Sequence, residues 1–253
     1  MRSAVFSVSV DDGHPHDMRL AEMLHQHDLR ATFYVPVRNS EGPPVLTGAQ
    51  LRQLAQLFEI GSHTLEHRYL APLGLYDALR QIGEGKTGLQ ELLGQSVQGF
   101  CYPGGKYRPL HCAMVQAAGF RYARTIQNFR FDTGEDPFEV PTTLQFYPHS
   151  RAVLFRNFLS QGDWNARQEG LALLAAERDW LKRLYLMFEH THRSKTVFHL
   201  WCHSIDIERL GLWPQLDAFL AFVSRHIPVA SRLDNGQLVA RYCEGKPTTA
   251  RLS

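Results

Sequence analysis

The sequence lacks long hydrophobic runs, a dense set of cysteines and a large excess of charge of one sign. No stretch of its 253 residues approaches the roughly 20 apolar residues that a membrane span needs. The formal net charge is only +2, which gives no indication of a nucleic-acid partner. The four cysteines form no C-x-x-C pair, so we expect reduced thiols rather than a disulfide framework.

The N-terminal residues do not lead us to expect a signal peptide. Met1, Arg2 and Ser3 are followed directly by a strand-like stretch, which leaves no room for an apolar targeting segment and a cleavage site. We therefore expect a cytoplasmic protein without a membrane span. One residue type is abundant, because 13 histidines are many for this length and permit a metal site.

Strand-like and helix-like segments alternate along the chain. Strands are expected at 4–10, 31–37, 59–62, 100–102, 122–126, 196–203 and 227–230, and helices at 17–27, 50–58, 75–93, 108–118, 166–190 and 214–225. Residues 128–165 contain several prolines and are expected to be irregular. Repeated strand–helix units predict a parallel sheet, and their number favours a closed or nearly closed α/β barrel.

Two aspartates, Asp11 and Asp12, follow the first predicted strand and precede Gly13. Successive side chains at a strand end point in different directions, so one carboxylate can bind a metal ion while the other faces a water beside it. The same residues are typical of a polar turn in which Asp caps a helix and Gly allows a tight bend. Taken alone, the D-D-G pattern favours the turn.

Two histidines, His63 and His67, follow the predicted strand 59–62. In a helical turn, their spacing places both imidazoles on one face, where they can share a cation. A lone H-x-x-x-H pair is a weak signal, but in a barrel of parallel strands the polar strand ends gather at one face. Imidazole and carboxylate ligands suit one divalent ion, Zn2+ above all, with Co2+, Ni2+, Mn2+ or Fe2+ as alternatives.

His203 ends the predicted strand 196–203, where it could protonate a leaving group. A hydrogen-bonded core position is an equally open interpretation for His203, and it is the preferred one for His199, which lies deeper on the same face. The glycines of Pro103-Gly104-Gly105 allow close approach of the backbone to a ligand, and an amide there could stabilise an oxyanion. A simple turn would also explain these glycines.

Together these motifs resemble, in order and spacing, those of the polysaccharide deacetylases with a NodB-homology domain, carbohydrate esterase family 4. The resemblance covers about residues 4–230 and comprises Val8-Ser9-Val10-Asp11-Asp12-Gly13, His63-Thr64-x-x-His67, Tyr102-Pro103-Gly104-Gly105 and Leu200-Trp201-Cys202-His203. It implies a distorted (β/α) barrel with about seven parallel strands. It also implies one catalytic domain over 1–253, with an irregular and helical insertion at about 128–195.

The resemblance further implies a role for each motif residue. It assigns Asp12, His63 and His67 to the metal, Asp11 to the catalytic base, His203 to the catalytic acid and the Gly104 amide to the oxyanion. Three departures stand out. Cys101 occupies the position of an arginine that orients the base, and Gly104 replaces an aromatic residue. The aspartate that pairs with the catalytic histidine is not evident, and Asp132 and Asp136 are candidates.

The implied activity is metal-dependent hydrolysis of the N-acyl (or O-acyl) group of an amino sugar. A cytoplasmic location favours a carbohydrate or carrier-linked sugar precursor as the substrate and partner. One alternative is an amidohydrolase of the allantoinase type, which acts on a non-sugar, non-peptide C–N bond. The other is a non-catalytic carbohydrate-binding relative, which is suggested by the absence of an arginine at position 101. The sequence does not indicate an oligomeric state.

Overall fold

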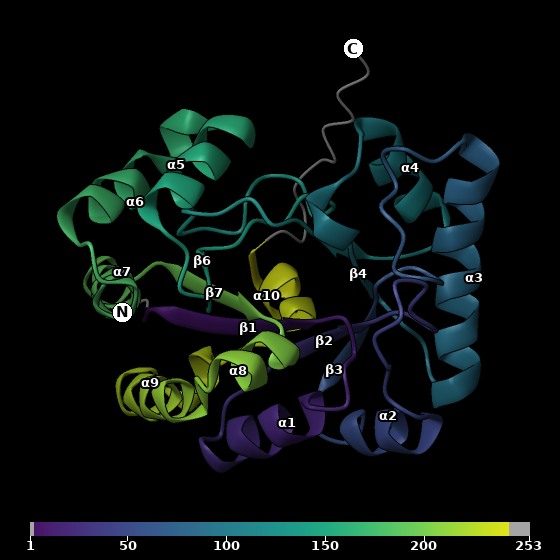
Figure 1. The fold of residues 1–253 in the computed structure, drawn as a ribbon, viewed down its shortest axis with the longest axis horizontal. Helices are drawn as coiled ribbons and strands as arrows, with labels where there is room; N and C mark the ends of the chain where they lie inside the picture. The colour runs from purple at the N-terminus through teal and green to yellow at the C-terminus, as the bar shows by residue number, and fades with distance from the viewer. Residues whose placement is uncertain (1–2, 243–253) are drawn as a thin grey trace.

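A seven-stranded parallel sheet forms the centre of the computed structural model, which describes residues 3–242 (Figure 1). The strands are β1 (Val5–Asp11), β2 (Thr32–Val35), β3 (Glu59–Ser62), β4 (Gly99–Cys101), β5 (Tyr122–Arg124), β6 (Leu144–Gln145) and β7 (Val197–Cys202). Their order in the sheet is β5-β4-β3-β2-β1-β7-β6, and all neighbours are parallel. This sheet confirms the predicted distorted (β/α) barrel, in the form of a half-barrel.

Helices surround the sheet, with α3 along one side and α5 and α6 at the opposite corner (Figure 1). They are α1 (Asp17–Gln26), α2 (Gly48–Leu54), α3 (Leu75–Leu93), α4 (Pro109–Ala117), α5 (Arg151–Ser160), α6 (Trp164–Ala176), α7 (Trp180–Ser194), α8 (Ser204–Leu210), α9 (Trp213–His226) and α10 (Asn235–Tyr242). Two short 3-10 helices, η1 (Pro103–Gly105) and η2 (Val229–Ser231), complete the elements. Within residues 3–242, no helix has the length and apolar character to cross a membrane.

Strand β1 is buried on both faces, and the two faces differ in character. On one face Phe6 stacks on Phe198 and meets Phe188 edge-on, which forms an aromatic core. On the other face Ser9 accepts a hydrogen bond from Asn235 of α10 at 2.7 Å. Because buried hydroxyl and amide groups need partners, this polar network fixes α10 against the inner face of the sheet.

Two predicted elements were wrong. The strand expected at 227–230 is a turn with η2, because Pro228 lacks the N–H that a strand ladder requires and the Ser231 N–H bonds back to its carbonyl. The helix expected at 166–190 is divided into α6 and α7. Asp179 starts the second helix, since its side chain accepts a hydrogen bond from the Lys182 N–H at 2.8 Å.

The segment expected to be irregular, 128–165, contains regular elements as well. It includes the two-residue strand β6 and the helix α5, whose first turn is capped by the Ser150 hydroxyl. The short helices α8 and α10 were not predicted either. Cys101, Cys112 and Cys202 form no disulfide within the described residues, and Cys243 lies outside them.

Candidate metal centre

The three predicted metal ligands converge at the carboxyl ends of β1 and β3. The Oδ1 atom of Asp12 lies 3.1 Å from His67 Nε2 and 3.5 Å from His63 Nε2. The three potential donor atoms all lie within 4.8 Å of one another. Asp12 Oδ1 is buried, and no hydrogen bond of normal geometry reaches it from residues 3–242. A buried carboxylate oxygen that faces two ring nitrogens in this way fits a divalent ion.

The opposite nitrogen of each imidazole has its own partner. His63 Nδ1 lies 2.9 Å from the carbonyl oxygen of Cys101 and must donate to it, because a carbonyl can only accept. His67 Nδ1 lies 3.2 Å from the Glu41 carboxylate. Both contacts orient the rings so that Nε2 faces Asp12, which is the arrangement that metal-binding histidines require.

The His63–His67 segment is a turn rather than the helical turn predicted from its spacing. Thr64 (φ 71°) and His67 (φ 58°) adopt left-handed backbone conformations, as does Asp12 (φ 78°). Such torsions cost about 1 kcal/mol or more in a residue other than glycine, so surrounding contacts must hold them. Gln81 of α3 does so, because its carbonyl accepts from the Leu65 N–H and its side chain from the Glu66 N–H.

Asp12 carries a stable negative charge in this setting. Burial alone would raise the pKa of Asp12, but the close imidazoles of His63 and His67 and the charge of His203 hold it well below its usual range. The carboxylate is therefore ionised at neutral pH, as a metal ligand must be.

Asp11 is buried beside this centre and forms an ion pair with Arg124 of β5. Burial would lower the pKa of Arg124, but the Asp11 carboxylate more than offsets it and raises that pKa. The sequence reasoning missed this arginine. A signal was present, since Arg124 lies inside the predicted strand 122–126, strands of a parallel sheet are usually buried, and a buried arginine almost always has a partner.

A second trio of potential donors, Asp11, His63 and Cys101, also lies within 4.8 Å. The Arg124 guanidinium already neutralises Asp11 there, and a cation beside it would be repelled. The trio of Asp12, His63 and His67 is therefore the better candidate for a metal.

His203 follows β7 and faces the same centre. Its Nε2 lies 3.8 Å from Asp12 Oδ2, and its Nδ1 lies 3.2 Å from Asp206 Oδ2. Burial would lower the pKa of His203, but Asp206, Asp12 and Asp11 outweigh it and raise the pKa to about 9. His203 is therefore protonated at neutral pH.

The expected partners of this histidine were wrong. Asp132 pairs with Arg130 in an exposed loop, and Asp136 accepts the backbone N–H of Phe138. Both carboxylates stabilise turns of the loop, which is the usual role of aspartate two residues before an N–H. Asp206 in the first turn of α8 is the partner of His203, three residues along the chain.

His199 is a core residue, as its depth on the strand predicted. Its Nδ1 donates to the carbonyl oxygen of Pro141, and its Nε2 lies 2.7 Å from the Ser9 hydroxyl. Burial and the nearby Arg124 lower the pKa of His199 to about 3. A neutral, fully bonded imidazole is unsuited to donate a proton to a substrate.

Gly104 lies beside Tyr69, which follows the histidine turn. The left-handed conformation of Gly104 (φ 57°) suits glycine, and a Cβ there would meet Tyr69 Cε1 at 2.8 Å. The Tyr69 ring stands edge-on to His67 at 6.4 Å and is 43% exposed. The family's aromatic residue at position 104 is replaced by glycine, but Tyr69 places an aromatic side chain next to the metal centre.

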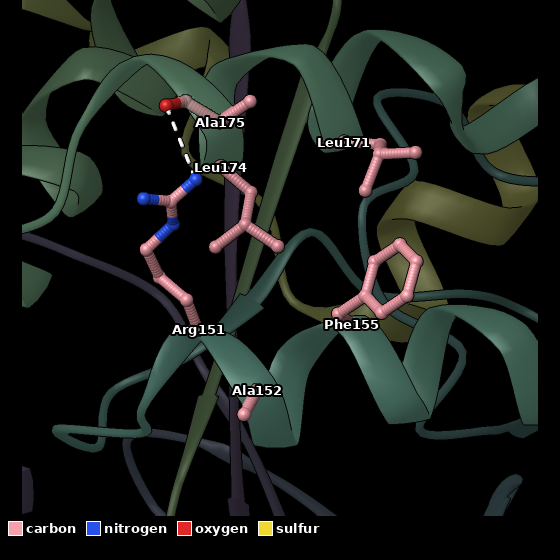
Figure 2. A pocket seen from close by; sticks show the side chains of 6 residues that line it. All are labelled: Arg151, Ala152, Phe155, Leu171, Leu174 and Ala175. Carbon is pink, nitrogen blue, oxygen red and sulfur yellow. Dashed lines mark hydrogen bonds between the residues drawn. The ribbon is translucent and has the colours of Figure 1, made fainter.

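An apolar groove of about 470 Å3 lies elsewhere, between α5 and α6 (Figure 2). Figure 2 shows Phe155 and Leu171 at one end and Arg151, which donates to the Ala175 carbonyl, at the other. None of its lining residues belongs to the cluster around Asp12. The groove is therefore not part of the candidate metal centre.

A barrel of parallel strands with two histidines and an aspartate at the strand ends is an architecture typical of metal-dependent hydrolases. Residues 2–123 match the family model described as polysaccharide deacetylase. Residues 2–123, just under half of the chain, are thus similar to the polysaccharide deacetylases, and the resemblance predicted from the motifs is confirmed. No curated protein matches the sequence.

Solved structures show the same fold. A Mycobacterium smegmatis protein assigned to the polysaccharide deacetylases is 14% identical with a TM-score of 0.61, and the alignment covers 98% of this chain and 94% of that one. The Xyl-CE4 domain of a xylanase from the Trinervitermes trinervoides hindgut metagenome is 12% identical, with a TM-score of 0.53 and coverages of 94% and 91%.

The Streptococcus pyogenes deacetylase PplD, solved with acetate, is 18% identical with a TM-score of 0.50. The alignment with PplD covers 53% of this chain and 62% of PplD. The alignment with a Bacillus cereus polysaccharide deacetylase covers 45% of the Bacillus cereus chain. This chain therefore spans less than two thirds of these two proteins.

Proposed function

We propose that this protein is a metal-dependent deacetylase that removes the N-acyl (or O-acyl) group of an amino sugar. The observation that carries the proposal is the convergence of Asp11, Asp12, His63, His67 and His203 at one end of the barrel. The family match of residues 2–123 supports a sugar substrate. In the proposal, that substrate is a carbohydrate or a carrier-linked sugar precursor.

Asp12, His63 and His67 would hold one divalent ion, with Zn2+ proposed first because of its affinity for imidazole and carboxylate ligands. When bound, such an ion acts as a Lewis acid toward an acyl oxygen and makes water a stronger nucleophile at neutral pH. The buried Asp12 carboxylate and the oriented imidazoles of His63 and His67 would provide the ligands.

The remaining residues divide the proton transfers between them. Asp11, fixed by Arg124, accepts the proton of the attacking water as general base. The Gly104 amide donates to the oxyanion that develops on the acyl group. His203, protonated at neutral pH, then gives its proton to the leaving amine, which yields the amino sugar and a carboxylate.

Arg124 also bears on the alternative of a non-catalytic relative. That alternative depended on the missing arginine at position 101, and the structure supplies a guanidinium to Asp11 from β5. The absence of an arginine at position 101 therefore no longer argues against catalysis.

The proposal is tested by elemental analysis of the purified protein, followed by measurement of acetate release from N-acetylglucosamine oligomers. We expect about one divalent ion per chain and turnover that a chelator removes and the metal restores. A protein with neither metal nor turnover would contradict the proposal and favour carbohydrate binding. Hydrolysis of a small cyclic amide instead of the sugar would favour the amidohydrolase.

A substitution of Asp206 tests the role of His203. In Asp206→Asn the carboxylate that raises the pKa of His203 is removed, so His203 loses its proton at a lower pH. Because the acid must be protonated, the alkaline limb of the kcat/KM profile should move to lower pH, by roughly 1 unit or more. The control is Asp132→Asn in the exposed loop, which should leave the profile unchanged. An alkaline limb that does not move in Asp206→Asn would refute this role.

A further inference from the structure

Arg124 makes an unusual connection across the barrel. It is among the largest fully buried side chains, and within residues 3–242 its one carboxylate partner is Asp11. Strands β5 and β1 are separated in the sheet by β4, β3 and β2, so the guanidinium reaches Asp11 across the inner face of the curved sheet. The rings of Tyr34 and Trp201 each lie 5.3 Å from its Cζ atom, which confines the guanidinium further.

Cys101 is the neighbour of Arg124 in the sheet. The two residues are paired in the register of β4 and β5, so their side chains emerge on the same face. Both are fully buried, and the Cys101 Sγ lies 4.0 Å from Asp11 Oδ2. Two adjacent strands thus direct one side chain each toward the same carboxylate, and the small thiol leaves room for the guanidinium.

We propose that Arg124 is the positioning residue of Asp11, and that positions 101 and 124 form an exchangeable pair in which either strand can supply the guanidinium. This inference rests on the proposed function, because it takes Asp11 as the base. Arg124 binds Oδ1, whereas within residues 3–242 the contact recorded for Oδ2 is the long one with the Cys101 thiol, at 4.0 Å. Oδ2 is therefore the oxygen that remains to accept the proton of water.

The test exchanges the two residues. Arg124→Cys should lower kcat by about 100-fold, the loss expected when a catalytic group is misplaced by about 1 Å, while KM and metal content stay near wild-type values. Cys101→Arg places a second guanidinium beside the first and should lower the unfolding temperature. The double variant, Cys101→Arg with Arg124→Cys, should regain most of the lost kcat, which is a non-additive result.

Two further variants separate positioning from general stability. Arg124→Lys keeps the charge but not the planar fork, so its kcat should lie between those of wild type and Arg124→Cys. Arg167→Met removes another fully buried arginine, one that bonds to the carbonyl oxygens of Asn128 and Phe158. It should lower the unfolding temperature and leave kcat unchanged.

Two outcomes would overturn the inference. One is wild-type kcat in Arg124→Cys. The other is a double variant that regains the wild-type unfolding temperature but keeps the low kcat of Arg124→Cys. A wild-type protein without turnover on any acylated sugar would refute the proposed function instead. In that case the unfolding temperature alone tests whether positions 101 and 124 are exchangeable. A double variant that regains the wild-type unfolding temperature would support the exchange, and one that does not would refute it.

Discussion

Asp12→Ala is expected to lose the bound metal ion and to lower kcat by about 100-fold or more, since even residues that only support metal ligands contribute 10- to 100-fold. Asp12 supplies the negative charge of the centre, and its Oδ1 is the atom that both imidazoles face. Without it, two neutral histidines remain, which is too few ligands for tight binding of a catalytic ion. Elemental analysis and steady-state kinetics on the same preparation measure both losses.

The matched control for this variant is Asp217→Ala. Asp217 is an exposed carboxylate that also contacts a histidine, His27, but it lies on α9. The Asp217→Ala variant should keep full metal content and full activity. If Asp12→Ala keeps both as well, the assignment of Asp12 as a ligand is wrong.

Asp11→Asn is expected to keep the metal and to lower kcat by about 1000-fold, within the usual contribution of a general base. The amide cannot accept a proton, although it retains the shape of the side chain. The variant should also be less stable by about 3 kcal/mol, because the buried guanidinium of Arg124 loses its counter-ion. Metal content, kcat and unfolding temperature are measured together.

The metal content of this variant distinguishes two roles for Asp11. Loss of the ion would place Asp11 among the ligands, as in the trio with His63 and Cys101, and would contradict its assignment as base. Full retention of activity would contradict both roles. The kinetics are recorded well below the unfolding temperature, so that loss of folded protein does not imitate loss of chemistry.

The sheet and the metal centre were largely predictable from the sequence, for a shared physical reason. A buried parallel strand reads as a short apolar run, and the polar residues that follow such runs meet at one end of the barrel. Asp12, His63 and His67 were therefore recognisable as a group before their distances were known. Strand β6 was not, because two residues are too few to show a period.

The residues that support the metal centre were harder to predict, and the reasons differ from one residue to the next. Arg124 reaches Asp11 across the inner face of the curved sheet, from a position opposite Cys101 that is set by the register of β4 and β5. No local sequence pattern reveals which residues of two strands lie opposite one another. Asp206 was within reach, because an aspartate in the first turn of a helix after His203 is a local feature. The break between α6 and α7 was also recoverable from Asp179, a good cap inside an apparently continuous helix.

The left-handed torsions of Asp12, Thr64 and His67 bear on how a cation would enter the centre. Contacts formed on folding, such as those of Gln81, offset the unfavourable free energy of these torsions. Binding of an ion would therefore require no change in the backbone of the turns. The ligands would form a preorganised site. The speed of metal capture should then follow how fast each kind of ion sheds its own water, and exchange of one metal for another should proceed without any opening of the protein.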